Sequence, residues 1–237
     1  MNRFLTRPLY LQLRDALVER IARGQWKPGA AVPNEQDLAR EFGVSPGTMR
    51  KALDLMESMR LITRRPGRGT FINDPSSEEL ANRYNTVRRA NGASIPDDVA
   101  CGEITEAPAN DAECERLRLT KDDHVYRLNR RRLTGGRAYM VEDVSLPATV
   151  FPGLADAQIP YPLITTLASQ YGILLGKADE RVSADGASLE IAEALGIAFQ
   201  TPVMVLDRVV FGIDGRPIEW RVGWYHLPGG HYFAEMT

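Results

Sequence analysis

The chain has 237 residues, of which 43% are hydrophobic and 25% are charged, and its formal net charge is −2. This composition is that of a globular protein with a sizeable core, and it excludes wholesale disorder. The sequence contains no apolar run of the roughly 18 residues needed for a membrane helix and no apolar N-terminal signal stretch. We therefore expect a cytoplasmic protein with no membrane partner.

The charge is distributed unevenly along the chain. Residues 1–75 hold 13 Lys and Arg against 8 Asp and Glu, a net charge of +5, whereas residues 76–237 hold 16 against 23, a net charge of −7. A basic N-terminal part joined to an acidic remainder is typical of a nucleic-acid-binding module attached to a second domain. Solvated charged faces alone also produce such an imbalance, so charge by itself does not indicate nucleic-acid binding.

The basic part is predicted to form three helices. Leucines and isoleucine recur every four positions over residues 8–23, with a proline in the first turn, which predicts the first helix. The second is expected to begin after Pro33, with Asn34 as its N-cap. Ser45 is expected to cap the third helix, which follows a tight turn at Gly43. Two short helices joined in this way form a helix-turn-helix. The residues expected to face inward from the third helix are Met49, Ala52, Leu53 and Met56.

A β-hairpin is predicted after the third helix. Residues 61–65 and 70–72 alternate as short strands do, and they flank a glycine-rich basic turn. Arg65 and Arg68 stand between small residues at its tip. Such a tip can approach a phosphate backbone or enter a minor groove, where arginine is favoured.

Four segments within residues 8–72 resemble the winged helix of GntR-type bacterial transcription regulators: Pro8-Leu9-Tyr10, Pro33-Asn34-Glu35-Gln36-Asp37-Leu38-Ala39, Val44-Ser45-Pro46-Gly47-Thr48-Met49-Arg50-Lys51-Ala52-Leu53 and Gly67-Arg68-Gly69-Thr70-Phe71. The resemblance implies that the third helix lies in the major groove of operator DNA and that the hairpin touches the minor groove. The chain departs from many members at Gln36 and Pro46, where they have arginine. The candidate DNA-binding residues are Glu35, Gln36, Ser45, Pro46, Gly47, Thr48, Arg50, Lys51, Arg65, Gly67, Arg68 and Gly69.

Three polar residues of the N-terminal part also fit a role without DNA. A capping role alone would account for Ser45 and Asn34, and solvation alone would account for Lys51. A polar, proline-containing stretch then marks the boundary where the composition turns acidic. We place the DNA-binding domain at residues 1–74, a linker at 75–82, and an effector-binding and dimerisation domain at 83–237.

The acidic part contains a weak internal repeat. Residues 125–130 resemble residues 203–208, and the Gly-Arg pair at 136–137 resembles that at 215–216. Each copy is predicted to run helix, turn, strand, hairpin turn, strand, with helices near residues 109–117 and 188–195. A helix at 163–171 and a strand at 174–183 would link the copies. The fold class is therefore α+β: a winged helix-turn-helix joined to an α/β domain with a central, mostly antiparallel sheet.

Residues 101–232 resemble the UTRA effector-binding domain of the HutC branch of GntR regulators, whose fold is similar to chorismate lyase. The resemblance implies an effector pocket, for which the candidate residues are Arg130, Arg132, Glu142, Glu219 and Tyr225. Arginine recognises carboxylate or phosphate bidentately, and a nearby glutamate accepts hydrogen bonds from hydroxyl or amine groups. Structural ion pairs would also account for the charged residues, and a core position would account for Tyr225.

The sequence has no nucleophile elbow, Walker loop or dinucleotide fingerprint, and its three histidines show no metal-ligand spacing. We therefore expect no catalytic residue, cofactor or metal site. The leading hypothesis is a repressor that binds an inverted-repeat operator as a homodimer and is released by a small polar or anionic metabolite. One alternative is an enzyme that uses the chorismate lyase-like body, with the DNA-binding head as an accessory. Another is a constitutive DNA-binding protein whose body only dimerises.

Overall fold

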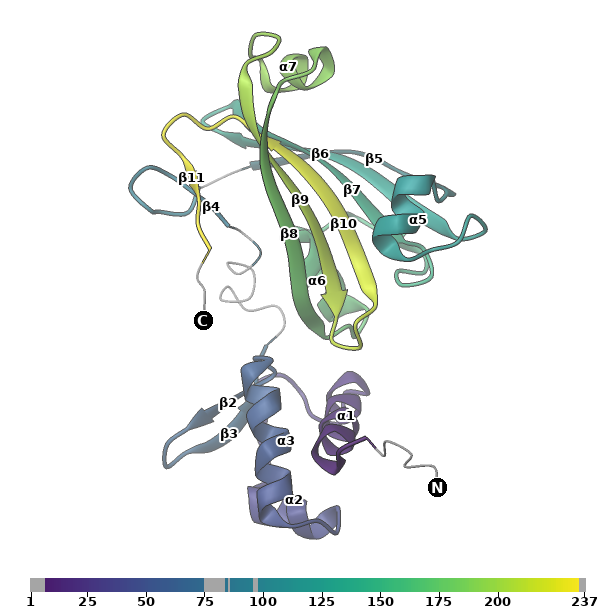
Figure 1. Cartoon of the computed structure of the whole chain (residues 1–237), viewed down its shortest axis with the longest axis vertical. Helices are drawn as coiled ribbons and strands as arrows, with labels where there is room; N and C mark the ends of the chain where they lie inside the picture. The colour runs from purple at the N-terminus through teal and green to yellow at the C-terminus, as the bar shows by residue number, and fades with distance from the viewer. Residues whose placement is uncertain (1–6, 75–83, 85, 96–97, 235–237) are drawn as a thin grey trace, which may run out of the picture. The chain divides into compact units, whose positions relative to one another are not determined.

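A computed structural model describes residues 7–74, 84, 86–95 and 98–234 (Figure 1). The chain divides into two compact units, here called the head and the body. The head contains residues 7–74, and the body contains nearly all described residues from Tyr84 onward. The predicted linker at residues 75–82 lies outside the described residues. Among the helices that the structure describes, none has both the length and the apolar character to cross a membrane.

The head consists of three helices and a small antiparallel sheet with strand order β1-β3-β2. The predicted helices and hairpin are present, whereas β1 was not predicted, because two residues are too few to show strand alternation. Pro8 was expected in the first turn but is the N-cap residue, one position before the helix. The elements are α1 (Leu9–Ala22), β1 (Ala31–Val32), α2 (Glu35–Glu41), α3 (Pro46–Ser58), β2 (Ile62–Arg65) and β3 (Gly69–Ile72).

The core of the head lies between α1 and α3. Leu13 and Leu17 of α1 are buried, as are all four residues predicted to face inward from α3. Leu9 was expected to extend the apolar stripe of α1, but it is 51% exposed, because it belongs to the first turn, at the end of the helix. The buried stripes fix the orientation of α3, so its polar residues face outward.

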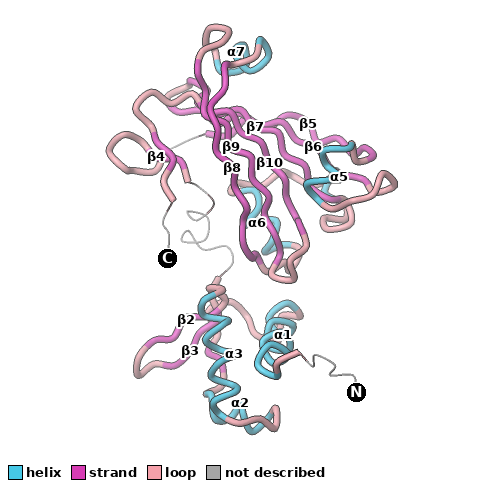
Figure 2. Tube along the Cα trace, viewed as in Figure 1, coloured by secondary structure: helices cyan, strands magenta, loops and turns pink. Residues whose placement is uncertain are grey.

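The body is built on one six-stranded sheet with the order β5-β6-β7-β10-β9-β8, in which every neighbouring pair is antiparallel. Figure 2 shows these strands as one twisted layer with the helices of the body outside it. The strands are β5 (Asp98–Pro108), β6 (His124–Thr134), β7 (Arg137–Pro147), β8 (Leu175–Gly186), β9 (Pro202–Gly212) and β10 (Pro217–Tyr225). The remaining elements are α5 (Asp111–Leu117), η1 (Leu154–Asp156), α6 (Leu163–Gln170), α7 (Leu189–Leu195), and the short paired strands β4 (Val87–Arg88) and β11 (His231–Tyr232).

The internal repeat appears in the sheet as two copies of a strand-helix-strand-strand unit. The first is β5-α5-β6-β7, the second is β8-α7-β9-β10, and the copies meet where β7 pairs with β10. The strand predicted at residues 174–183 is therefore the first strand of the second copy rather than a link. Its counterpart β5 was missed because most of its residues are exposed, so it carries little of the alternation that marks a strand.

The two faces of the sheet differ in chemistry. On one face, α7 packs against Val141 and Trp224, and α5 contributes Leu117 to an apolar cluster that includes Trp220. The opposite face, here called the charged face, is defined by side chains that share it through the strand register. These are Arg130 and Glu142, which lie opposite each other on β6 and β7, together with Glu180, Arg208, Glu219 and Arg221.

Candidate DNA-binding and effector sites

The N-terminal turn of α3 is exposed and capped. The hydroxyl oxygen of Ser45 accepts a hydrogen bond from the backbone N–H of Thr48 at 3.2 Å, and the two hydroxyl oxygens lie 2.8 Å apart. Pro46 stands in the first turn, where its missing N–H costs nothing. Gly47 and Lys51 are exposed. Ser45 thus acts as a cap, as the sequence predicted, and leaves a helix N-terminus open to solvent.

Arg50 and Glu35 form a two-point ion pair across the helix-turn-helix. Arg50 Nε donates to Glu35 Oε2 at 3.1 Å, and Arg50 Nη2 lies 2.9 Å from Glu35 Oε1. The hydrogen bond and the negative charge of Glu35 raise the pKa of Arg50. This geometry occupies the Nε and Nη2 atoms of the guanidinium and leaves Nη1 outside the pair, and the Arg50 side chain is 66% exposed. Gln36, next to Glu35 on α2, is also exposed.

The hairpin tip has the conformation that its glycines allow. Gly67 and Gly69 have φ of 69° and 106°, which side chains rarely adopt, and the N–H of Arg68 closes the turn onto the carbonyl of Arg65 at 2.9 Å. The Arg65 guanidinium lies 5.1 Å from the centre of the Phe71 ring. Both arginines are exposed at the tip.

A third hairpin arginine has a structural role instead. Arg64 pairs with Asp54 at 2.5 Å and with Glu57 at 2.9 Å, and both carboxylates belong to α3. This contact ties the hairpin to the helix. The head therefore presents an open helix N-terminus, an oriented arginine on α3 and an arginine-bearing tip, which together can contact phosphates and base edges.

On the charged face, the five candidate effector residues are buried: Arg130 (2% exposed), Arg132 (7%), Glu142 (0%), Glu219 (0%) and Tyr225 (7%). Glu142 accepts from Arg221 Nη1 at 2.9 Å, and its other oxygen lies 3.3 Å from Arg130 Nη1. Arg221 also reaches Glu219, with 2.7 Å between Nη2 and Oε1. Of the structural ion pairs that the sequence allowed, Arg130–Glu142 is present, whereas Glu219 pairs with Arg221, a residue that was not predicted.

Two arginines of the charged face were not among the predicted residues. Arg221 lies two positions after Glu219 on β10, so strand alternation could have placed both on one face. Arg208 is 2% exposed and is the repeat counterpart of Arg130, so the internal repeat carried a signal for it. Arg132 donates to the hydroxyl of Tyr161 at 3.0 Å, away from the Glu142 pairs.

Electrostatics keep this cluster ionised despite its burial. Burial alone would raise the pKa of Glu142, but the positive charges of Arg221 and Arg130 outweigh it and hold that pKa below its usual value. Burial and the charge of Glu142 raise the pKa of Tyr225, so its hydroxyl stays protonated. Four buried atoms of the cluster have no hydrogen-bond partner among the described residues: Arg130 Nε and Nη1, Glu142 Oε1, and Glu219 Oε2.

A cavity of about 300 Å³ opens at one end of the sheet, where β9 begins, β10 ends and the β4–β11 pair lies. Of the candidate effector residues, Tyr225 lines it and the Arg–Glu cluster does not. Met204, Leu227 and Val87 form apolar walls, and His226 and His231 add imidazoles. The candidates thus divide into a buried ionic cluster and a tyrosine that faces an open cavity.

The chain matches two family models that together cover most of its length. Residues 9–72 match the gntR family of bacterial regulatory proteins, and residues 101–228 match the UTRA domain. The first match spans the helix-turn-helix and hairpin, and the second spans the six-stranded sheet from β5 to β10 apart from its first residues.

Relatives also match over most of the chain. The chain is 30% identical over 237 residues to the HTH-type transcriptional regulator Rv0792c of Mycobacterium tuberculosis, covering 96% of this chain and 85% of the relative. It is 26% identical to the Escherichia coli mannosyl-D-glycerate transport/metabolism system repressor MngR, with 90% of each covered. The crystal structure of PhnF from Mycobacterium smegmatis has the same fold, with a TM-score of 0.56, 24% identity and coverage of 94% of this chain and 98% of PhnF.

These matches decide between the hypotheses raised by the sequence. The family consists of transcription regulators rather than enzymes, so the alternative of an enzyme with an accessory head is not supported. The chain belongs to the gntR family of bacterial regulatory proteins, in the form that carries a UTRA domain, and it is a DNA-binding transcription regulator.

Proposed function

We propose that this regulator is a repressor that binds an inverted-repeat operator as a homodimer and is released when a small polar or anionic metabolite binds the body. The observation that carries the proposal is the head surface, where the N-terminal turn of α3, Arg50 and the hairpin tip are exposed in one small domain. Its site of action would be the cytoplasm, where bacterial DNA lies.

Each part of the head has a role in the proposed complex. The N-terminus of α3, with Ser45, Pro46, Gly47 and Thr48, would meet a phosphate, because the positive end of the helix dipole favours an anion there. Arg50 would contact a base edge with the guanidinium side that Glu35 leaves open. Gln36 and Lys51 flank that contact. The tip residues Arg65, Gly67, Arg68 and Gly69 would enter the minor groove.

The small size of this surface supports the proposed homodimer. One recognition helix reads only a few base pairs, and winged and other helix-turn-helix proteins gain affinity by placing two heads on half-sites one helical turn or its multiples apart. A two-fold dimer therefore requires a two-fold operator. We assign residues 1–74 to operator binding and residues 83–237 to effector binding and dimerisation, with 75–82 between them.

The charged face would supply the effector site. The donor Arg130 Nε and the acceptor Glu219 Oε2 are buried without a hydrogen-bond partner among the described residues, and a buried polar group is costly unless it is hydrogen-bonded. A metabolite that offers both an anionic group and hydroxyl or amine groups would satisfy both kinds. Tyr225 would present its protonated hydroxyl from the adjoining cavity. Arg132 would contribute the remaining positive charge.

The proposal that this regulator is a repressor is supported by two of its relatives. MngR of Escherichia coli and NagR of Bacillus subtilis are both repressors, and the chain is 26% and 24% identical to them, over 90% of its length in each case. By linkage, an effector that releases DNA must bind the free protein more tightly than the DNA-bound protein. A metabolite with equal affinity for the two forms would rule out this mechanism.

The first experiment is an in vitro selection of random duplex DNA on the purified full-length protein at two salt concentrations. We expect a recurring inverted repeat that binds less tightly at high salt, because phosphate contacts release counterions. Enrichment of single half-sites would contradict the dimer, and no enrichment, with binding only at low salt, would contradict sequence-specific binding. The selected operator then serves as the probe in a metabolite screen, where release of DNA identifies the effector and the sign of regulation is read from a promoter fusion.

A further inference from the structure

Arg208, on the charged face, donates hydrogen bonds to three different residues. It lies on β9 and is 2% exposed. Its Nη1 donates to the carbonyl of Tyr84 at 2.5 Å, its Nη2 donates to Thr86 Oγ1 at 3.1 Å, and its Nε donates to the carboxylate of Glu180 on β8. One side chain of the sheet thus holds two residues that are more than 120 positions earlier in the chain.

Glu180 connects the same arginine to the C-terminal end of the body. Its second carboxylate oxygen accepts a hydrogen bond from the hydroxyl of Tyr232 on β11, and this bond contributes, after burial, to raising the pKa of Tyr232 to about 12. β11 pairs with β4, and the N–H of Phe233 donates to the carbonyl of Thr86 at 2.7 Å. The Arg208–Glu180 pair therefore fastens both short strands to the sheet.

The residues that Arg208 contacts lie close in sequence to the connection with the head. Tyr84 and Thr86 to Arg88, here called the linker-proximal segment, are the first described residues of the body after residues 75–83. Residues 75–82 are the proposed connection to the operator-binding head. The linker-proximal segment is therefore the described part of the body that lies nearest to the head in sequence.

Arg208 also lies beside the proposed effector site. It lies directly opposite Arg221 across the β9–β10 pair, on the same face of the sheet. Its charge acts on both Glu142 and Tyr225, two of the candidate effector residues. Val87, in the linker-proximal segment, lines the cavity together with Tyr225. Arg208 thus contacts the linker-proximal segment and neighbours the residues that would bind the metabolite.

We propose that Arg208, held by Glu180, is the positioning residue that couples the charged face to the linker-proximal segment, so that operator binding by the head and ligand binding on the charged face influence each other through it. The proposal rests on the proposed function, because it needs an operator and an effector. In this proposal Arg208 links the effector site to the operator-binding head, whereas Arg221 balances the charges of Glu142 and Glu219.

Hydrogen–deuterium exchange on the full-length protein, with and without the selected operator DNA, tests the coupling. In the wild-type protein, operator DNA should protect α3 and should also change exchange, by about tenfold, in peptides that contain the linker-proximal segment and β11. In Arg208→Gln, protection of α3 should remain and the change in the body should be lost. Arg208→Lys, which keeps the charge but cannot make all three contacts, should retain only part of the change.

Two further variants control the test. Arg181→Gln removes an exposed arginine from the neighbouring strand β8 and should behave as the wild type does. Glu180→Gln leaves Arg208 in place but weakens its anchor, so it should reproduce the loss even if Arg208→Gln folds poorly. Protection of α3 without any change in the body of the wild type would overturn the coupling and leave the proposed function intact, as would an unchanged response in both Arg208→Gln and Glu180→Gln. Failure of operator DNA to protect α3 would overturn the proposed function itself.

Discussion

The head and the body use the same arginine–glutamate chemistry in opposite environments. In the head, Arg50 and Glu35 pair at the surface, with side chains that are 66% and 23% exposed. In the body, Arg221 pairs with Glu142 and Glu219. The side chain of Arg221 is 11% exposed, and those of both glutamates are 0% exposed. Exposure to solvent determines which partners each ion pair can contact. The surface pair leaves one side of Arg50 able to contact DNA, whereas the buried cluster must stay paired or receive a ligand.

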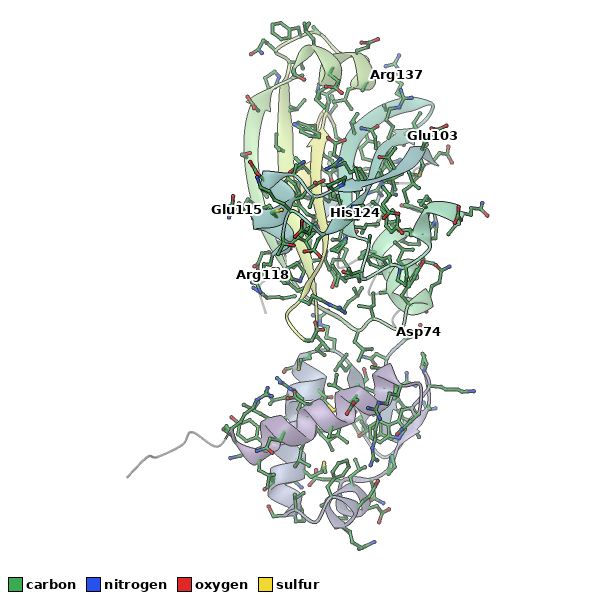
Figure 3. The ribbon with its side chains drawn as sticks, turned by 90° about the vertical axis from the view of Figure 1, so that its right-hand side faces the viewer. Asp74, Glu103, Glu115, Arg118, His124 and Arg137 are labelled. Atoms are coloured by element: carbon green, nitrogen blue, oxygen red, sulfur yellow. The ribbon has the colours of Figure 1, made fainter. Side chains whose placement is uncertain are left out.

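The energetic expectation differs accordingly. Exposed ion pairs contribute about 0–1 kcal/mol to folding, because water screens them and side-chain entropy opposes them. Removing one partner of a buried pair leaves an uncompensated charge in the protein interior. Charged residues of the head should therefore affect binding, and those of the charged face should affect stability. Exposed charges at the periphery of the body, such as Glu103, Glu115 and Arg137 in Figure 3, should affect neither strongly.

The largest effect is expected for Glu142→Ala. This change leaves Arg130 and Arg221 buried near each other without their shared carboxylate, which should lower the free energy of unfolding of the body by about 3–5 kcal/mol. Urea denaturation followed by circular dichroism measures it. Glu103→Ala, on the exposed strand β5, is the control and should stay within about 0.5 kcal/mol of the wild type. A loss below about 1 kcal/mol in Glu142→Ala would mean that water reaches the cluster freely.

The next effect concerns operator binding. Arg50→Ala removes a side chain expected to contact a base edge, and it should weaken binding of the selected operator by about 1–3 kcal/mol while leaving stability unchanged. Arg23→Ala is a matched control, because Arg23 is also 66% exposed and paired with a glutamate, but it lies just after α1 rather than on α3. Fluorescence anisotropy gives both affinities. Equal losses in the two variants would reduce the role of Arg50 to general electrostatics.

The same contrast explains what could be predicted from the sequence. In the head, Ser45, Asn34 and Gly43 act through bonds or backbone angles within a few residues, so the helices were predicted almost to the residue. On the charged face, Arg130 and Arg132 stand two positions apart on one strand, so alternation predicts that both are on one face with Arg131 on the other, and Arg131 is indeed exposed.

What the sequence did not reveal depends on pairing between distant strands. Arg208 owes its contacts to a segment 122 and 124 positions away, and Arg221 meets Glu142 across 79 positions. No local pattern carries such information. The cavity beside Tyr225 has the same origin, because it exists only where the ends of β9 and β10 meet the β4–β11 pair. The position of Glu35 beside Arg50 likewise required the packing of α2 against α3.

Acid should act on the body through its buried carboxylates. Interactions with arginine lower the pKa of Glu142 in spite of its burial, and the same holds for Glu113, which accepts from Arg127, Asn110 and Ser145. A folded-state pKa below the unfolded value of 4.5 means that these groups stabilise the body above about pH 4.5. That contribution is lost as the pH falls through the folded-state values. The urea concentration at the midpoint of unfolding should therefore decrease as the pH is lowered from 6 to 3. The decrease should be less steep in Glu142→Gln than in the wild type. An equal dependence of the urea midpoint on pH in the variant and the wild type would contradict the role of Glu142 in acid sensitivity.

The smallest effect offers the closest comparison between the two units. Ser45 caps α3 in the head and Ser188 caps α7 in the body, each accepting from a backbone N–H at 3.2 Å. Replacing either serine with alanine should cost about 1 kcal/mol of stability, because a capping bond is lost in both cases. Only Ser45→Ala should also weaken operator binding, since only that helix N-terminus is expected to meet a phosphate. Denaturation and anisotropy on both variants separate the two roles. An unchanged operator affinity in Ser45→Ala, with the stability loss present, would show that Ser45 is a cap and no more.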